Sequence, residues 1–479
     1  MLKKKCYIYN LLISILIILL SEKSKSSYIT IPFKIYKGEE PTTYNSIEDY
    51  FTYQTELKYY GKISIGDEKS PIPIFFSFDD FGFYFITKGT DLGDVNSNYD
   101  PTSSQSCKID KKGYVFFRTY QNATKANDTF IFNTHSNNPL KCKLIKFLYC
   151  FIDNKKKNSF LMIGLRLLGD LIRDSDLNLV QQLKHNKYID TYDWSIQYDE
   201  KHPGEEGVLI IGTEPHKYKP EKYNENYYFN SVTMSKESYG IWNIKFDKIY
   251  FLNNKEEELE ITDYKKFSLV HKSGLIAGTK SYEKLLKQYF FDAFISQNKC
   301  FMEKSKLDSR VYFCKNTEEI KKELKKKFPP LKMLQKAFMK TFELNYDDLF
   351  MEKGDKIYFL IYFSYYQLSM WEAGLPFLKK YFFNYNYDTK LISFYNNELE
   401  NMEKNMESKG NNKVKLFIVI GLTLIVTVFG FYIGRKIVLM RRKQKLTATE
   451  LENDFSKHIS GSEYKPPSNG KENSKYRLI

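Results

Sequence analysis

The sequence predicts a mostly β protein of two lobes with short helices, followed by one C-terminal transmembrane helix. Tyr and Phe are abundant, at 39 and 38 residues, and aromatic residues are enriched in strands. Short apolar runs bounded by Gly, Pro and Asn recur along the chain, and a similar series starts again after about residue 230. The 479 residues suffice for two such lobes, and residues 416–434 carry no charge.

Both ends of the chain predict export and membrane anchoring. Three lysines at 3–5 precede an apolar stretch over 7–20 and then small polar residues, which is typical of a secretory signal peptide; an uncleaved anchor is the alternative. The uncharged segment 416–434 would span roughly 28 Å as a helix, close to the hydrocarbon thickness of a bilayer. Basic residues follow it directly, which predicts that the C-terminal side lies in the cytoplasm.

The expected elements follow from these runs and their breaks. The predicted order is a signal peptide at 1–26, an N-terminal lobe at 27–230, a C-terminal lobe at 231–396, a stalk at 397–413, a transmembrane helix at 414–434 and a tail at 435–479. In the first lobe we expect a strand–turn–strand unit within 59–87, strands at 114–120, 130–132, 144–151, 194–198 and 208–211, and a helix at 177–185. In the second we expect strands at 241–246, 249–252, 269–277, 357–365 and 391–395, and helices at 281–293 and 319–328.

The formal charge of +15 does not indicate nucleic-acid binding. The lysines are spread along the chain and mixed with Asp and Glu, as at 256–258 and 325–327, and scattered charge of this kind is typical of a solvated surface. No CxxC or His-rich spacing indicates a metal site, and no cofactor is expected.

The cysteines fit an oxidising compartment. Removal of Cys6 with the signal peptide leaves five. We predict a disulfide between Cys300 and Cys314, and two of Cys107, Cys142 and Cys150 could pair as well. Because five is odd, at least one thiol stays outside any intramolecular disulfide.

Several segments, taken in order, resemble the pepsin-like aspartic proteases (peptidase family A1). The resemblance covers about residues 57–396, and its first-half segments are 59–66, 74–79, 162–165 and 180–183, with Tyr120 at the place of the family's flap tyrosine. Its later segments are 207–212, 239–246 and 371–394. The resemblance implies a bilobal acid-protease fold and a peptide-binding cleft between the lobes.

Such enzymes use two aspartates that share one proton and hold a water between them. In the first lobe the match falls on Phe78-Asp79-Asp80-Phe81-Gly82. One register makes Asp79 the catalytic acid, and the other makes it Asp80. Both registers lose the hydroxyl residue that normally follows, so a carboxylate is kept in an altered turn.

The second lobe lacks the matching acid. His271 stands at the position of the second aspartate, and Lys272 follows it. A histidine has no carboxylate with which to share the proton, and a charged lysine beside it would oppose acid chemistry. An Asp–His pair could activate water, but the more ordinary role is a hydrogen-bonded or solvent-facing histidine.

Two further motifs bear on function. The sequons at Asn122 and Asn127 are expected at the tip of the flap hairpin, where a glycan would obstruct the cleft. The tail ends with Tyr476-Arg477-Leu478-Ile479, which resembles the Tyr-x-x-apolar signal that clathrin adaptors bind.

These observations predict a single-pass pseudoprotease of endosomal or cell-surface membranes that binds a peptide or protein without cutting it. The alternative is a divergent aspartic endopeptidase. A third hypothesis is a cargo receptor or adhesion protein that depends on its tail. The expected partners are a peptide or protein ligand in the interlobe cleft, the membrane and clathrin adaptors, with no nucleic acid.

Overall fold

The computed structural model describes residues 28–36, 43–66, 71–80, 82–87, 99–102, 104–115, 123–133, 139–151, 159–166, 177–232, 241–253, 255–306, 308–364, 370–399 and 434–436. Its residues up to Glu400 belong to one compact unit. The predicted signal peptide, the flap residues Tyr120 and Asn122, nearly all of the predicted transmembrane helix and the motif at 476–479 lie outside the described residues. Within the described residues, no helix is both long and apolar enough to cross a bilayer.

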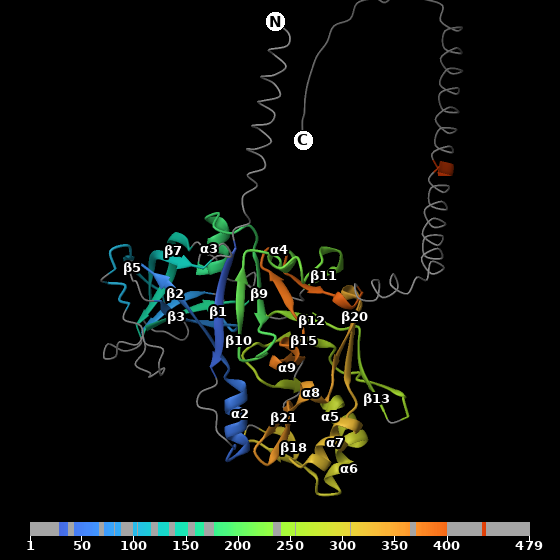
Figure 1. The fold of residues 1–479 in the computed structure, drawn as a ribbon. Coiled ribbons are helices and arrows are strands. Elements are labelled where there is room, and N and C mark those ends of the chain that lie inside the picture. Colours follow the sequence, from blue (N-terminus) through green and yellow to red (C-terminus); the bar gives the residue numbers. More distant parts are fainter. Residues whose placement is uncertain are drawn as a thin grey trace, which may run out of the picture. The chain divides into compact units, whose positions relative to one another are not determined.

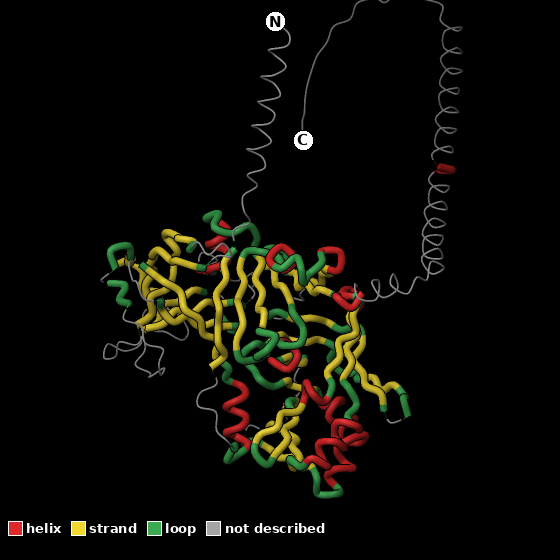
Figure 2. Tube along the Cα trace, viewed as in Figure 1, coloured by secondary structure: helices red, strands yellow, loops and turns green. Residues whose placement is uncertain are grey.

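The first half of the chain forms mostly strands (Figures 1 and 2). They are β1 (Ile29–Tyr36), β2 (Lys58–Ile65), β3 (Ile72–Ser77), β4 (Phe83–Thr87), β5 (Lys108–Val115), β6 (Ala123–Phe132), β7 (Leu140–Phe151), β8 (Ser159–Gly164), β9 (Asp193–Tyr198), β10 (Glu206–Ile211) and β11 (Tyr228–Val232). Its helices are α2 (Ile47–Thr55), α3 (Leu179–His185) and α4 (Pro215–Tyr218), with a 3₁₀ turn at Glu225–Tyr227.

The second half also combines strands with short helices. Its strands are β12 (Asn243–Lys245), β13 (Lys248–Leu252), β14 (Glu258–Glu260), β15 (Lys266–Leu269), β16 (Ile276–Gly278), β17 (Cys300–Lys304), β18 (Ser309–Lys315), β19 (Leu331–Gln335), β20 (Lys340–Leu344), β21 (Phe350–Lys353), β22 (Lys356–Phe359), β23 (Ile361–Ser364), β24 (Trp371–Ala373), β25 (Phe383–Asn386) and β26 (Leu391–Tyr395). Its helices are α5 (Lys280–Leu286), α6 (Asp292–Ile295), α7 (Glu318–Lys327), α8 (Tyr346–Leu349) and α9 (Leu375–Leu378), with a π-helical turn at Lys287–Phe291 and a 3₁₀ turn at Lys336–Phe338. The prediction of a mostly β protein with short helices is confirmed.

The described strands form three sheets. The first sheet has 13 strands in the order β11-β26-β25-β9-β10-β1-β2-β3-β8-β4-β7-β6-β5. The second has nine strands along β12-β15-β24-β16-β23-β18-β22-β21, with β17 paired to β18, and the third has four in the order β14-β13-β19-β20. The strands β25 and β26 therefore belong to the first sheet, although they come from the end of the described chain.

The same arrangement of four strands occurs once in each of the two larger sheets. In the first sheet β3 runs parallel to β8, β8 antiparallel to β4, and β4 parallel to β7. In the second sheet β15 runs parallel to β24, β24 antiparallel to β16, and β16 parallel to β23. The two halves therefore repeat one topology, and the loop after β3 corresponds to the loop after β15.

One predicted element is wrong, and strand β1 and helix α2 are among the elements that were not predicted. The apolar run 269–277 is not a single strand, because residues 270–275 form a loop between β15 and β16. Strand β1 alternates buried and open side chains, but its Pro32 weakens the sequence signal. The residues of α2 include six aromatic or β-branched side chains, and its buried apolar residues are only Ile47 and Tyr50.

Helix α2 links the first sheet to the second. Ser46 caps its N-terminus by accepting a hydrogen bond from the backbone of Asp49 at 3.1 Å. Tyr50 is fully buried and stacks on Tyr358 of β22, with ring centroids 4.4 Å apart. Since α2 lies between two strands of the first sheet and packs on a strand of the second, it connects the two halves.

We expect Tyr50→Ala to destabilise the protein by ~3–5 kcal/mol, because it removes a fully buried ring and leaves a cavity against Tyr358. Urea denaturation followed by intrinsic fluorescence measures this change. The control is Thr52→Ala on the exposed side of the same helix, which should shift stability by less than about 0.5 kcal/mol. Equal shifts for the two variants would contradict the role given to α2.

Candidate functional site

The two corresponding loops meet at one point. We name residues 78–82, between β3 and β4, the first loop, and residues 270–275, between β15 and β16, the second loop. The Nζ atom of Lys272 donates a hydrogen bond to Oδ2 of Asp79 at 2.5 Å. Both side chains are solvent-exposed, at 47% and 62%. The family resemblance in the sequence predicts two facing aspartates at this place. In this chain the carboxylate of Asp79 instead pairs with the ammonium group of Lys272.

Backbone hydrogen bonds from the two residues just after β8 hold the first loop. The N–H of Leu165 donates to the carbonyl of Ser77 at 2.7 Å, and the N–H of Arg166 donates to that of Asp80 at 2.9 Å. The guanidinium of Arg166 also donates to the carbonyl of Asp79 at 3.0 Å. Arg166 is thus a residue of the site that sequence reasoning missed, because nothing in its local sequence relates it to a loop some 85 residues away.

The second loop is held in the same way. The N–H of Val270 donates to the carbonyl of Ala373 at 2.9 Å, and the N–H of Leu375 donates to that of Ser273 at 2.7 Å. Between them, Gly374 lies so close to the loop that a Cβ atom would be 2.0 Å from the carbonyl oxygen of Leu275. Only glycine permits this approach.

Each loop is also bound by a side chain from the opposite half of the chain. The indole N–H of Trp242 donates to the carbonyl of Leu165, beside the first loop, at 2.9 Å. The hydroxyl of Tyr59, from β2, donates to the carbonyl of His271 in the second loop at 2.8 Å. These two contacts fix the backbones of the loops relative to each other, so the meeting of Asp79 and Lys272 rests on a buried framework.

Asp80 faces a less polar surrounding than Asp79. Its side chain is partly buried, and its Oδ2 accepts a hydrogen bond from Ser77 Oγ at 3.4 Å. Burial and the neighbouring Asp79 raise the pKa of Asp80, while Ser77 and two nearby cationic side chains oppose this shift. The first loop therefore holds two acids that differ in environment.

His271 is buried and lies away from the solvent-exposed pair. Its Nδ1 is 3.1 Å from the hydroxyl of Tyr198 and its Nε2 is 3.0 Å from that of Tyr385, and the residue is only 4% exposed. Its ring stacks on Phe78 with centroids 4.6 Å apart. Burial lowers the pKa of His271 from 6.5 to about 3, because an apolar surrounding disfavours the charged form.

The Asp79–Lys272 pair cannot share one proton in the way that two carboxyl groups can. Lys272 cannot act as the second acid of a dyad, because its ammonium group has no carboxylate oxygen to bind the opposite side of a water. His271 is buried between two tyrosine hydroxyls. Among the described residues it forms no hydrogen bond with the Asp79 carboxylate, whose partner is Lys272. The site is an ion pair on the surface of two loops.

The other predicted site residues have different outcomes. The disulfide between Cys300 and Cys314 is confirmed, and it joins the paired strands β17 and β18. Cys107, Cys142 and Cys150 form no disulfide in the described part of the chain, so the expected second pairing is not found there. Asn127 was expected at a hairpin tip, but it lies inside β6, paired with Lys108 and Lys146.

The sequon around Asn127 contains a buried carboxylate that the sequence did not reveal. Asp128 is fully buried and accepts hydrogen bonds from Ser104 Oγ at 3.0 Å, from Ser106 Oγ at 2.5 Å and from Tyr99. These contacts attach the segment before β5 to β6. Asp128 is thus a structural acid, and its neighbours along the chain give no pattern that would have indicated it.

One group of described residues has the composition of a metal site. Asp199, His202 and Glu206, around the turn between β9 and β10, place one ligand atom each within 4.8 Å of one another. The Oδ1 of Asp199 already accepts the N–H groups of Lys201 and His202, at 2.8 and 2.9 Å. Because Asp199 has this ordinary turn role and is exposed, the group does not indicate a metal.

No protein-family model matches this chain, and no curated protein sequence matches it. Among solved structures, the crystal structure of basic 7S globulin from soybean is similar over 78% of this chain and 97% of that chain. The TM-score is 0.47 and the sequence identity is 8%. This is a distant likeness in structure, and it says nothing of function.

We expect the stability of the protein to fall as the pH drops from about 6.5 towards 3, in part because of His271. In this window the unfolded chain binds a proton at His271 and the folded chain does not, so the stability is complete above the unfolded pKa and declines below it. One such proton contributes at most ~1.4 kcal/mol per pH unit.

The measurement is the free energy of unfolding in urea at several pH values, for the native sequence and for His271→Gln. The variant keeps a hydrogen-bond donor and acceptor but does not titrate, so its stability should depend less steeply on pH. The exposed His185 provides the control His185→Gln, which should change the slope less than His271→Gln does. Parallel curves for the native protein and His271→Gln would contradict the buried neutral state.

Proposed function

We propose that this chain is a catalytically inactive pepsin-like protein that binds a peptide or protein ligand between its two halves. Two findings support the pepsin-like part of the proposal. The four-strand arrangement around β3 has a counterpart around β15, and the two loops that follow these strands meet. Three of the sequence segments that resemble the family, 74–79, 162–165 and 371–394, include residues of β3, β8 and β24.

The hydrogen-bonded ion pair of Asp79 and Lys272 carries the inactive part of the proposal. An aspartic protease needs one protonated and one ionised carboxyl group that share a water. Here a lysine occupies the place that faces the remaining carboxylate, and the histidine that replaces the second acid is buried. Binding does not need the dyad, because main-chain hydrogen bonds and side-chain pockets can hold a peptide by themselves.

The membrane and sorting parts of the proposal rest on sequence pattern. We propose a single-pass protein with its folded unit outside the cytoplasm, anchored by residues 414–434 and sorted by the motif at 476–479 to endosomal or cell-surface membranes. The Cys300–Cys314 disulfide fits this assignment, because disulfides persist in oxidising compartments. The two sequons would carry glycans on the same side of the membrane.

An endopeptidase is the second candidate function, and one observation favours it. The first loop keeps two acids, and Asp80 has a raised pKa next to Asp79, as a proton donor beside a carboxylate requires. Residues 270–275 of the second loop contain no carboxyl group that could act together with Asp79 and Asp80. The two candidates differ in whether the full chain cleaves unfolded protein.

We expect no cleavage when the full-length chain, purified in detergent, is incubated with denatured casein between about pH 3 and pH 6. The physical reason is the absence of a second carboxyl group opposite Asp79. Gel electrophoresis and mass spectrometry of the casein measure the result.

The controls for this experiment are Asp79→Ala and Asp80→Ala. Both variants should match the native chain, because neither acid catalyses in the inactive protein. Cleavage by the native chain that disappears in either variant would overturn the proposal and support the endopeptidase.

We also expect removal of Tyr476–Ile479 to move the protein from endosomal to cell-surface membranes, because adaptors would no longer bind the tail. Surface biotinylation and fluorescence microscopy of the tagged protein measure the distribution. Tyr476→Phe should have a smaller or equal effect, and Lys475→Ala, just outside the motif, should have none. An unchanged distribution after the deletion would contradict adaptor sorting.

A further inference from the structure

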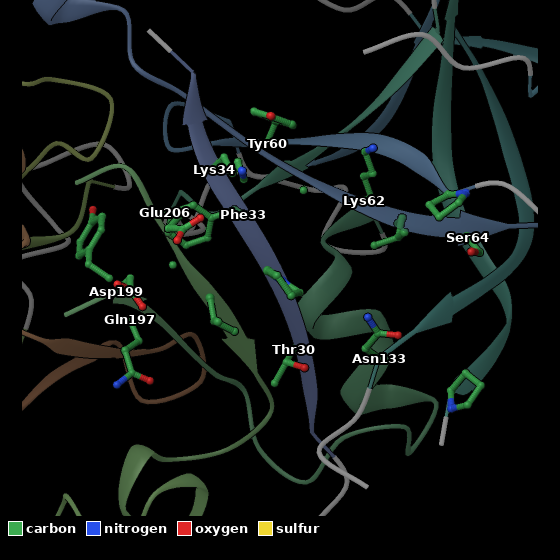
Figure 3. Close-up of a pocket in the computed structure, with 18 of the residues that line it drawn as sticks. Thr30, Phe33, Lys34, Tyr60, Lys62, Ser64, Asn133, Gln197, Asp199 and Glu206 are labelled. Carbon is green, nitrogen blue, oxygen red and sulfur yellow. The ribbon is translucent and has the colours of Figure 1, made fainter. Parts of the chain in front are cut away.

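A large groove lies on the solvent-facing side of the first sheet, and it has a volume of about 1150 Å³ (Figure 3). It is lined by residues of β1, β2, β10 and the turn between β9 and β10, but by neither Asp79 nor Lys272. We name it the open-face groove. The proposed function does not use it.

The backbone under the groove is already paired. Strand β1 pairs with β10 on one side and with β2 on the other, and β10 also pairs with β9. A peptide that binds by strand addition needs the free edge of a sheet, and these strands offer a face instead. A ligand of this groove must therefore be bound by side chains.

The charges that line the groove are close to balance. It is lined by four lysines and three acids, namely Lys34, Lys62, Lys201, Lys219, Asp199, Glu200 and Glu206. Lys34 lies directly opposite Glu206 in the register of β1 and β10, and Glu200 forms an ion pair with Lys222. A polyanion and a polycation would each meet groups of their own sign, so the groove favours an uncharged ligand.

The floor combines an apolar pair with polar neighbours. Pro32 and Val208 are direct partners in the register, so their side chains lie on the same face. Thr30, Ser64 and Asn133 also line the groove, and their side chains form no hydrogen bond to another described residue. Thr30 and Asn133 form an isolated antiparallel bridge, which sets their side chains next to each other (Figure 3).

A ligand with apolar faces and polar edges fits this lining. The hydroxyl groups of a sugar donate and accept hydrogen bonds, as those of serine and threonine do, so they can bind hydroxyl, carboxamide, ammonium and carboxylate groups alike. The C–H faces of its rings can lie on Pro32 and Val208. Hydrogen bonds to charged groups are stronger than those between neutral groups, so Lys62 and Asp199 can contribute although the ligand has no charge.

We propose that the open-face groove binds a neutral oligosaccharide of several sugar rings. The balanced charge argues against polyions, and the paired backbone argues against an added peptide strand. A purely apolar ligand would have to cover the charged lining, which is costly. The length follows from the volume of the groove, which exceeds the roughly 300–1,000 Å³ of pockets for one small molecule.

The test uses the full-length chain in a detergent without a sugar headgroup, and isothermal titration calorimetry measures the binding. The probes are the unlabelled pentasaccharides of cellulose, starch, mannan and chitin, and we expect at least one of them to bind. Because these ligands carry no charge, raising the salt from roughly 50 to 500 mM should change the affinity less than twofold.

The variant T30A/N133A should weaken this binding at least fivefold, because it removes a hydroxyl and a carboxamide from the lining. The matched control T52A/N226A removes the same two groups at exposed positions outside the groove and should leave the affinity within twofold. If T30A/N133A does not fold, Lys62→Ala at an exposed position of β2 replaces it, with an expected loss of at least threefold.

Three results would overturn the proposal. They are no binding of any of the four pentasaccharides, an equal loss of affinity in T52A/N226A, and binding only of a charged relative, such as a heparin fragment or the deacetylated pentasaccharide of chitin. The last result would mean that charge, and not the hydroxyl groups, selects the ligand. None of these results depends on whether the chain cleaves casein, so this proposal and the proposed function can fail separately.

Discussion

The hydrogen bonds of buried His271 to two tyrosines hold the centre of this structure together. Tyr198 comes from β9 and Tyr385 from β25, which are neighbours in the first sheet, whereas His271 belongs to the loop that follows β15 of the second. One neutral imidazole therefore attaches the second loop to the first sheet. Since this ring occupies the interior, the next side chain along the loop, Lys272, is the one that faces Asp79.

The two loops differ in their side chains but are held by similar contacts. In both, residues at or just after the end of the neighbouring parallel strand, β8 or β24, form backbone hydrogen bonds with the loop, and an aromatic residue of the other half contacts the adjoining backbone. These contacts do not involve the side chains of Asp79 and Lys272. The meeting of the two loops therefore does not require a pair of acids at their tips.

Local pattern predicted much of the fold but little of the site. The strand 391–395 and the helices near 179–185 and 318–327 follow from apolar runs, caps and charge. The run 269–277 was predicted as one strand because Leu269 and Ile276 are both apolar, although a hydrogen bond from the loop to β24 and another from Leu375 to the loop hold a loop between them. Which of His271 and Lys272 is buried depends on Tyr198 and Tyr385, and both are distant in sequence.

The position of β25 and β26 has a consequence for the order of folding. These strands complete the first sheet next to β9 and β11, and the contact of Asn384 with Asp193 joins residues 191 positions apart. Pairings of such long range are slow, because a large loop must close before the contact forms. The sheet that contains the N-terminal strand thus cannot close until nearly 400 residues have been synthesised, and until then β9 has an unpaired edge that a chaperone or another chain could bind.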